Sequence, residues 1–247
     1  MKIAFLFPVF NEEKRVNHIQ PFLEFLKVSF INQTYQIVFL LNNCTDNTES
    51  KLLEVFRNQD FKVRFIKSSS RSRGVGINAA LKSLKSDLFA ICAIDSAWDF
   101  KFYKESYDML NKEKGLKIVY GPKSHKESKV KTNIFRKFNS LMSYTYLKIL
   151  FGNYLKHETQ CIKMFKNDLN FINYLHNYNY FAETEFYLLA NITEHRSTSI
   201  PVNVKQKKGS KINLNNTFQF FKEALLFKFF LLKNKEILLS SRFEGKT

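Results

Sequence analysis

The first 121 residues alternate between short apolar segments and longer amphipathic ones, and this alternation restricts the fold more than any other feature of the chain. Strands that are apolar throughout and alternate with helices predict a mainly parallel sheet covered by helices on both faces. Such an α/β sheet binds its ligands beyond the carboxyl ends of the strands. The expected strands are Ile3–Val9, Gln36–Leu41, Val63–Ile66, Leu88–Ile94 and Leu116–Tyr120, and the expected helices are Glu13–Phe30, Asn47–Arg57, Gly76–Leu84 and Lys101–Asn111.

The second half is organised differently, and Gly121-Pro122 separates it from the first. Its apolar periodicity predicts helices at Thr132–Phe151, Phe181–Ala190 and Thr217–Leu239, and extended segments at His157–Phe165 and Ile200–Val204. A chain of 247 residues is typical of one domain. We therefore expect one α/β domain over residues 1–216, in halves 1–121 and 122–216, followed by an amphipathic helix and tail over residues 217–247.

The cysteines and the apolar runs narrow the class of protein. Cys44, Cys92 and Cys161 lie far apart, which argues against a zinc site or a disulfide framework and favours a reducing compartment. The apolar run Ile3–Phe10 is too short for a signal peptide, and no run approaches the length of a membrane-spanning helix.

The formal net charge of +17 favours an anionic partner such as a lipid surface, a phosphate or a nucleic acid. The same charge also arises when lysines simply occupy solvated faces. No recognisable nucleic-acid-binding motif is present, so no nucleic-acid partner is expected.

Polar residues follow each predicted strand of the first half. Asn11 can cap a helix with Glu12 and Glu13 in its first turn, and Asp99 can cap the helix beginning near Lys101. The segment Ser72–Gly76 opens another helix, where the glycines either form a plain turn or allow backbone N–H groups to approach a phosphate. Arg73 adds a charge suited to a diphosphate.

Several motifs, taken in order, resemble the family 2 glycosyltransferases, and among these the polyprenyl-phosphate glucosyl- and mannosyltransferases. They are Pro8–Glu13, Asp95, His157–Phe165, Phe181–Glu185 and Gly209–Lys211, and the resemblance extends from about residue 3 to about residue 230. It implies a GT-A fold with a donor half, 1–121, and an acceptor half, 122–216. It also implies inverting transfer of a hexose from a nucleotide-sugar to a dolichyl or undecaprenyl phosphate.

The resemblance implies the donor-binding residues. Asn42 and Asn43 stand where the family usually carries aspartates, and an Asn side chain can still bond a base edge because it offers both a donor and an acceptor. The residues implied for donor binding are Pro8, Phe10, Asn11, Glu13, Asn42, Asn43, Asp46, Arg73, Asp95 and Lys211.

The family's Asp-x-Asp motif is altered. Asp95 matches its first position, where the resemblance implies a catalytic and metal-binding carboxylate, but Ala97 occupies the second and cannot ligate a cation. Asp99, two residues later, is the candidate substitute. We expect Mg²⁺ or Mn²⁺ as cofactor, bound more weakly than by a complete motif.

The acceptor half carries a candidate phosphate clamp. Arg136 and Ser140 are four residues apart and share a helix face. The resemblance assigns them, with Lys123 and Gln160, to the lipid phosphate. It also matches Glu183 and Glu185 to paired acids that would serve as a general base for a hydroxyl acceptor.

The last predicted helix carries apolar residues at spacings of three and four, with lysines between them. The apolar residues are Phe218, Phe221, Leu225, Phe229 and Leu232, and the lysines are Lys222, Lys228, Lys233 and Lys235. This pattern predicts either an interfacial helix on an anionic bilayer or a helix packed on the sheet. An interfacial helix predicts a peripheral protein on the cytoplasmic face of a membrane.

Two alternatives to a polyprenyl-phosphate acceptor stay open. One is transfer to a saccharide hydroxyl in envelope polysaccharide synthesis, with Glu183 or Glu185 as base. The other is a degenerate sugar-nucleotide-binding protein without turnover, consistent with Ala97 and the Asn42-Asn43 pair. The sugar, the nucleotide and the oligomeric state stay open as well.

Overall fold

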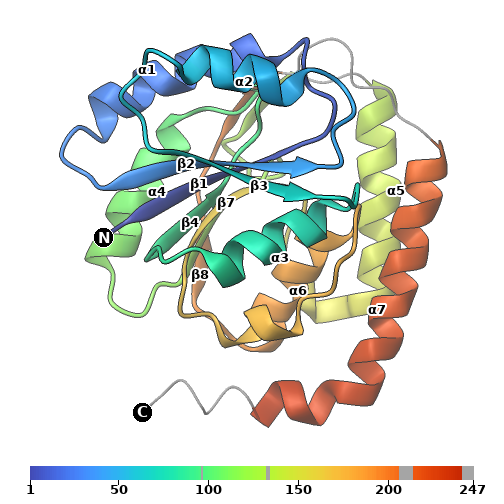
Figure 1. Ribbon diagram of the computed structural model, residues 1–247. Coiled ribbons are helices and arrows are strands. Elements are labelled where there is room, and N and C mark those ends of the chain that lie inside the picture. The colour runs from blue at the N-terminus through green and yellow to red at the C-terminus, as the bar shows by residue number, and fades with distance from the viewer. Residues whose placement is uncertain (96, 132–133, 206–213, 241–247) are drawn as a thin grey trace.

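A seven-stranded sheet in the order β3-β2-β1-β4-β7-β5-β8 runs through the centre of the computed structural model (Figure 1). The structure describes residues 1–95, 97–131, 134–205 and 214–240, without the side chains of residues 131, 134–137, 214, 235, 239 and 240. The strands are β1 (Ile3–Val9), β2 (Tyr35–Asn42), β3 (Val63–Ser68), β4 (Leu88–Ile91), β5 (Ile118–Gly121), β7 (Ile162–Lys166) and β8 (Ser197–Ser199).

The first four strands are parallel, as the sequence predicts. Side chains of β1 alternate between the two faces, so that Phe5 and Phe7 enter one core and Ala4 and Leu6 enter the other. Strand β7 then runs antiparallel to both β4 and β5. This α/β sheet, mostly parallel and buried on both faces, confirms the expected fold class.

Helices cover both faces of the sheet (Figure 1). One core lies beneath α1 (Gln20–Ser29), α2 (Thr48–Phe56) and α4 (Lys101–Lys112), and the short 3₁₀ helix η1 (Val16–Ile19) leads into α1. The opposite core lies beneath α3 (Arg73–Ser83), α5 (Ile134–Phe151), α6 (Ala182–Ile192) and α7 (Leu214–Ser240), with 3₁₀ turns η2 (Gly152–Tyr154) and η3 (Asn170–Tyr174).

The second half contains three further short strands, and the predicted extended segment Ile200–Val204 overlaps only the last of them. Strands β6 (Lys129–Lys131) and β9 (Asn203–Lys205) form a separate two-stranded parallel sheet, and β8 extends the main sheet beside β5. Each has three residues, which is too short to show a hydrophobic period.

The predicted extended segment His157–Phe165 forms a strand only from Ile162 onward. Before that point the backbone bonds to side chains of α6 instead of a neighbouring strand. The N–H groups of Lys156 and His157 donate to the Tyr187 hydroxyl at 3.0 and 3.2 Å. Hydrogen bonds to a side chain thus replace the strand-to-strand backbone hydrogen bonds that the sequence predicts for this segment.

The long helices α5 and α7 pack side by side along one edge of the molecule (Figure 1). The Tyr146 hydroxyl on α5 donates to the Phe221 carbonyl on α7 at 3.2 Å. Helix α7 bends at Asn234, whose backbone dihedrals leave the helical region. Among the described residues, no helix has both the length and the apolar character needed to cross a bilayer.

We expect Phe22→Ala to lower the free energy of unfolding by about 3–5 kcal/mol, because it empties a large site in the core. The Phe22 ring is 2% exposed and makes edge contacts with Phe5, Phe7 and Tyr103 at 5.2–5.6 Å between centroids. Urea denaturation measures the change. The control is Ile31→Ala, which alters a side chain that is 77% exposed and should shift stability by at most about 0.5 kcal/mol.

Candidate functional site

A cleft of about 410 Å³ opens beyond the carboxyl ends of β1 and β4, where a parallel α/β sheet is expected to bind its ligand. It collects side chains from both halves of the chain. The residues that line it are Pro8, Val9, Phe10, Glu12, Arg15, Asn42, Arg71, Arg73, Cys92, Ala93, Ile94, Asp95, Asn179 and Tyr180.

Of the donor residues expected from the sequence, Pro8, Phe10, Asn42, Arg73 and Asp95 line this cleft. Lys211 lies outside the described residues. The other four, Asn11, Glu13, Asn43 and Asp46, are not among its lining residues.

Those other residues build the loops behind the cleft. Asn11 accepts from the Thr45 N–H at 2.8 Å, and Asp46 accepts from the Glu13 N–H at 3.1 Å. Glu13 in turn accepts from the Asn47 N–H at 3.0 Å. These bonds hold the loop after β1 against the loop after β2. Asn11, Glu13 and Asp46 therefore fix the geometry of the two loops.

The turn at the end of β2 places the side chains of Asn42 and Asn43 in different surroundings. Asn42 ends β2 and is 3% exposed, whereas Asn43 is exposed with φ of 54°. The Asn43 N–H donates to the Ser68 carbonyl at 2.7 Å, which fixes this turn. Of the two amides expected to meet a base edge, only Asn42 lines the cleft.

Three arginines give the cleft a cationic wall, and the sequence analysis identified only Arg73. The Arg71 guanidinium lies over the Phe10 ring, 4.2 Å from its centroid, and Arg15 also lines the cleft. Guanidinium groups bind phosphate oxygens in a bidentate manner. The sequence could have indicated Arg71 as well, because Arg71 and Arg73 lie two residues apart in the segment that follows β3 and opens α3.

Glu12 also lines the cleft and was not expected there. Its carboxylate pairs with the Arg15 guanidinium at 2.6 Å. Burial raises the pKa of Glu12, and although Arg15 opposes this effect, the negative charge of Asp95 adds to it. Glu12 and Asp95 therefore place two interacting carboxyl groups at the same strand ends.

Asp99 is committed to other contacts. One of its oxygens accepts from the Lys101 N–H at 3.0 Å and caps α4, and the other accepts from the Asn203 side chain at 2.9 Å. Its own N–H donates to the Asn203 carbonyl at 3.0 Å, beside β9. Asp99 is not among the residues that line the cleft, in contrast to Asp95.

The cleft fits a divalent cation only in part. Mg²⁺ and Mn²⁺ prefer oxygen ligands, and Mg²⁺ often uses one or two carboxylates together with substrate phosphates. Asp95 offers such a carboxylate, and one of its oxygens already accepts the Ala97 N–H at 3.2 Å. Within the described chain, no group of three or more His, Cys, Asp or Glu side chains could hold a metal. A cation there would depend on oxygens supplied by the bound substrate.

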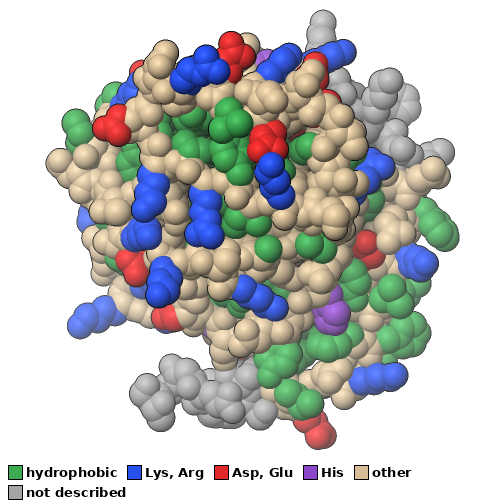
Figure 2. All heavy atoms as spheres, in the orientation of Figure 1, with side chains coloured by type: hydrophobic (Ala, Val, Ile, Leu, Met, Phe, Trp, Pro, Cys, Tyr) green, Lys and Arg blue, Asp and Glu red, His purple; other side chains and the backbone are tan. Residues whose placement is uncertain are grey.

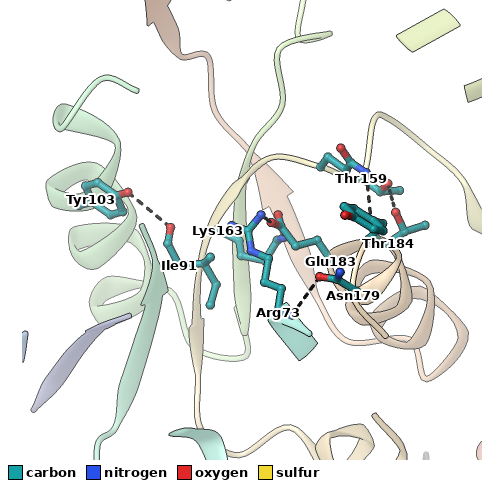
Figure 3. A network of polar contacts seen from close by, with 10 residues as sticks. Arg73, Ile91, Tyr103, Thr159, Lys163, Asn179, Glu183 and Thr184 are labelled. Atoms are coloured by element: carbon teal, nitrogen blue, oxygen red, sulfur yellow. Dashed lines mark hydrogen bonds and ion pairs between the residues drawn. The ribbon is translucent and has the colours of Figure 1, made fainter. Parts of the chain in front are cut away.

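Glu183 forms an ion triad with a half-exposed arginine and a buried lysine, and the triad links the two halves of the chain (Figure 3). Its oxygens lie 2.6 Å from Arg73 on α3 and 2.8 Å from Lys163 on β7. Burial by itself raises the pKa of Glu183, but the charges of Arg73 and Lys163 outweigh it, so the pKa lies below its ordinary value. A carboxylate held in this way is a weak base.

Glu185 faces the interior and not the cleft. Its side chain is fully buried, and one oxygen accepts the His176 N–H at 3.0 Å and contacts His176 Nδ1 at 2.5 Å. Burial raises the pKa of Glu185. The two glutamates that the sequence pairs thus occupy different environments, because they lie two residues apart on a helix.

The amino terminus of α3 bonds to protein and not to an open anion site. The Gly74 N–H donates to the Tyr178 carbonyl at 2.9 Å, and the Arg73 N–H donates to the Asn179 side chain at 3.2 Å. A Cβ at Gly74 would lie 2.3 Å from that carbonyl oxygen. The expectation that glycines here free the backbone for a phosphate is therefore wrong, since Gly74 is needed for chain packing.

The residues expected to bind the acceptor lie around the second half. Lys123 lies over the Trp98 ring, with 5.0 Å from Nζ to the centroid, and its positive charge helps to lower the pKa of Glu183. Gln160 is exposed and donates to the Tyr180 carbonyl at 3.5 Å, at the cleft wall. Arg136 and Ser140 both lie on α5, where Ser140 is exposed and the Arg136 side chain is outside the description.

We expect Glu183→Gln to destabilise the protein by about 3–5 kcal/mol at neutral pH, because it leaves the buried Lys163 ammonium without its counter-charge. The folded pKa of Glu183 lies below its ordinary value of 4.5, so the stability it contributes is present above that pH and is lost as the pH falls through the folded pKa. Urea denaturation of both proteins at neutral and acid pH measures the difference.

The control variant is Glu113→Gln, which breaks the exposed pair between Glu113 and Arg196 and should cost at most about 1 kcal/mol. Equal losses for the two variants, or a Glu183→Gln effect that does not shrink in acid, would contradict the importance of the triad.

The sequence model of the glycosyl transferase family 2 matches residues 5–171, a span that contains the strands and the carboxylates of the cleft. A search of curated proteins gives no significant match.

Two solved structures illustrate the likeness in fold. Glucosyl-3-phosphoglycerate synthase from Mycobacterium tuberculosis, in complex with Mn²⁺, UDP and glucosyl-3-phosphoglycerate, is 13% identical with a TM-score of 0.66, covering 92% of this chain and 79% of the synthase. Mannosyl-3-phosphoglycerate synthase from Rubrobacter xylanophilus is 12% identical with a TM-score of 0.65, covering 96% and 75%. The family match spans more than half of the residues, and the chain therefore belongs to glycosyl transferase family 2, as a glycosyltransferase with a GT-A fold.

Proposed function

We propose that this enzyme transfers a hexose from a nucleotide-sugar to a polyprenyl phosphate at the cytoplasmic face of a membrane. The observation that carries the proposal is the position of Tyr180. This residue lines the cleft, and its hydroxyl donates to Asn216 at 2.8 Å on α7. A cationic cleft thus adjoins a helix with exposed apolar side chains, which suits an anionic head group carried on a lipid.

The exposed apolar side chains of α5 and α7 support a membrane-facing surface. Figure 2 shows hydrophobic side chains along α7 with basic side chains between them. The exposed residues of this surface are Phe138, Leu141, Met142 and Ile149 on α5 and Phe218, Leu225, Leu226, Phe229, Leu232 and Ile237 on α7. Apolar side chains interleaved with lysines are typical of helices that lie on anionic lipid.

In the proposed reaction an oxygen of the lipid phosphate attacks the anomeric carbon. A new carbon–oxygen bond forms on one face while the bond to the nucleoside diphosphate breaks on the other, which inverts the configuration. The acceptor oxygen is already ionised, so no general base is needed. This requirement agrees with Glu183, whose carboxylate is held by two cations and whose pKa is lowered.

The chain's own cations would stabilise the leaving diphosphate. Arg71 and Arg73 face the cleft, and Glu183 fixes the orientation of Arg73 at 2.6 Å. Asp95 would hold Mg²⁺ or Mn²⁺ together with the donor phosphates, and the cation would neutralise charge on the departing diphosphate. With Ala97 in the second motif position, more of this neutralisation falls to the arginines.

A small phosphorylated acceptor is the second candidate. The similar synthase of M. tuberculosis has been solved with UDP-glucose, Mn²⁺ and phosphoglyceric acid, at 12% identity and a TM-score of 0.64. Lys123 and Gln160, beside the cleft wall, would receive the phosphate of either acceptor. A saccharide hydroxyl is less well served, because Glu185 faces the interior and Glu183 is a weak base.

We expect one of the UDP-, GDP- or dTDP-sugars to stabilise the fold by about 2.7 kcal/mol at 100 times its dissociation constant. Mn²⁺ should strengthen this binding in the wild type and in Asp99→Ala, but not in Asp95→Ala, because Asp99 is committed to Lys101 and Asn203. Thermal shift with and without Mn²⁺ measures both effects. An Mn²⁺ effect that survives Asp95→Ala and disappears in Asp99→Ala would reverse the assignment, and no shift with any donor would refute the donor site.

We expect Arg136→Ala to reduce transfer to polyprenyl phosphate by about ten- to a hundredfold while donor binding is unchanged, because a charge-assisted phosphate bond contributes about 1.5–3 kcal/mol. The assay follows a radiolabelled sugar into an organic-extractable product. Arg57→Ala, an exposed arginine that follows α2, is the matched control and should leave transfer unchanged.

The same assay separates the candidate acceptors. Label that appears only in water-soluble phosphoglycerate or saccharide products, with Arg136→Ala silent, would replace the lipid acceptor by a soluble one. Donor binding without transfer to any acceptor would favour the non-catalytic alternative.

A further inference from the structure

The C-terminal helix α7 places a buried carboxylate against the wall of the cleft. Glu223 is 4% exposed, although it lies on a helix whose other faces carry exposed apolar residues. Its oxygens accept from three consecutive backbone N–H groups, those of Asn179 at 3.2 Å, Tyr180 at 3.0 Å and Phe181 at 2.9 Å. The Gln219 side chain, one turn earlier on α7, donates to Glu223 at 3.0 Å and fixes its rotamer.

The turn held by Glu223 belongs to the cleft. Asn179 and Tyr180 both line it, and Phe181 is the residue that precedes α6. Two residues after Phe181, Glu183 forms the ion pair that orients Arg73. The position of this turn therefore sets two wall residues directly and the Arg73 guanidinium through Glu183.

The opposite side of the same turn is fixed by α3. The Gly74 N–H donates to the Tyr178 carbonyl at 2.9 Å, and Ser72 Oγ donates to the Asn177 carbonyl at 2.6 Å. The turn is thus held between α3, which carries Arg73, and α7, which carries Glu223. Of these two supports, only the one from α7 comes from outside the residues matched by the family model, 5–171.

The chemistry explains why a carboxylate is used. The three N–H groups come before the first turn of α6 and have no partner within that helix, so they need another acceptor. A carboxylate at the amino end of a helix also interacts favourably with the helix dipole. Without it, buried N–H groups would be left without a partner, and the turn would move to find water.

We propose that Glu223 is a positioning residue for the donor site, so that α7 maintains donor affinity in addition to presenting an apolar face. This inference rests on the proposed binding of a nucleotide-sugar in the cleft. It makes the C-terminal helix a working part of the donor site, connected to it by one carboxylate and by the Tyr180–Asn216 hydrogen bond.

The experiment compares Glu223→Gln with the wild type and with Glu236→Gln, which alters an exposed glutamate on the same helix. Titration of the nucleotide identified by the thermal screen, followed calorimetrically, gives the dissociation constant. We expect Glu223→Gln to weaken binding by about tenfold or more, because displacing a binding group by even 1 Å is costly, and to raise the KM for the donor more than it lowers kcat. Glu236→Gln should match the wild type.

A second pair of measurements keeps the test decisive if Glu223→Gln folds poorly. Asn216→Ala removes a second polar contact from α7 to the turn without leaving a buried charge and should also weaken nucleotide binding. Hydrogen exchange should accelerate at the Asn179, Tyr180 and Phe181 amides in Glu223→Gln, but stay unchanged in the core strands β1 and β2.

The outcomes are distinct. Nucleotide binding equal to wild type in both Glu223→Gln and Asn216→Ala overturns the inference and leaves the donor site intact. A wild type that binds no nucleotide overturns the proposed donor site and this inference with it. A fall in kcat with an unchanged donor KM would also overturn it, since a positioning role in donor binding must appear in the donor's affinity.

Discussion

The ion triad of Glu183 with Arg73 and Lys163 is the interaction on which the site depends. Each member comes from a different element, α6, α3 and β7, and the elements are far apart in the sequence. The buried Lys163 ammonium requires a counter-charge, and the half-exposed Arg73 guanidinium joins the pair from α3, so the complete triad forms only when the two halves of the chain pack together. It therefore couples folding of the sheet to the orientation of Arg73 in the cleft. The same pairing makes Glu183 a structural anion, since a carboxylate stabilised by two cations has little tendency to accept a proton.

The electrostatics of the cleft reflect the altered metal-binding motif. Where a second aspartate would stand, Ala97 contributes no ligand, and Asp99 is engaged with α4 and β9. Arg15, Arg71 and Arg73 instead line the same cleft as Asp95 and Glu12. Guanidinium groups and a divalent cation serve the same purpose on a diphosphate, because both neutralise its negative charge. The cleft thus has the charge pattern of a nucleotide-sugar site in which protein cations take a larger share.

Helix α7 has two distinct surfaces. Phe220, Ala224 and Phe227 are buried against the body of the protein, and Glu223 reaches the cleft wall from the same face. Phe218, Phe229 and Leu232 are more than half exposed on the other side. The sequence predicts either a packed helix or an interfacial one. The two are compatible, because one face of α7 packs against the protein while the opposite face is exposed. An event that shifts α7 would be transmitted to Asn179 and Tyr180 through Glu223.

The sequence by itself determined the α/β class, the first four strands and the helices between them, because apolar runs and helical periods are local properties. It also identified Pro8, Phe10, Asn42, Arg73 and Asp95, which lie at or after the carboxyl ends of strands and so meet at one edge of the sheet. The tertiary structure alone decided that Asn11, Glu13 and Asp46 brace loops, that Asp99 bonds to Asn203 on β9 and does not line the cleft, and that Glu12, Arg15 and Arg71 do line it. It also decided that Glu183 and Glu185 face different surroundings and that Glu223 supports the cleft. Those roles depend on contacts between residues up to 106 positions apart, such as Arg73 with Asn179. The spacing of residues along the chain does not predict such contacts.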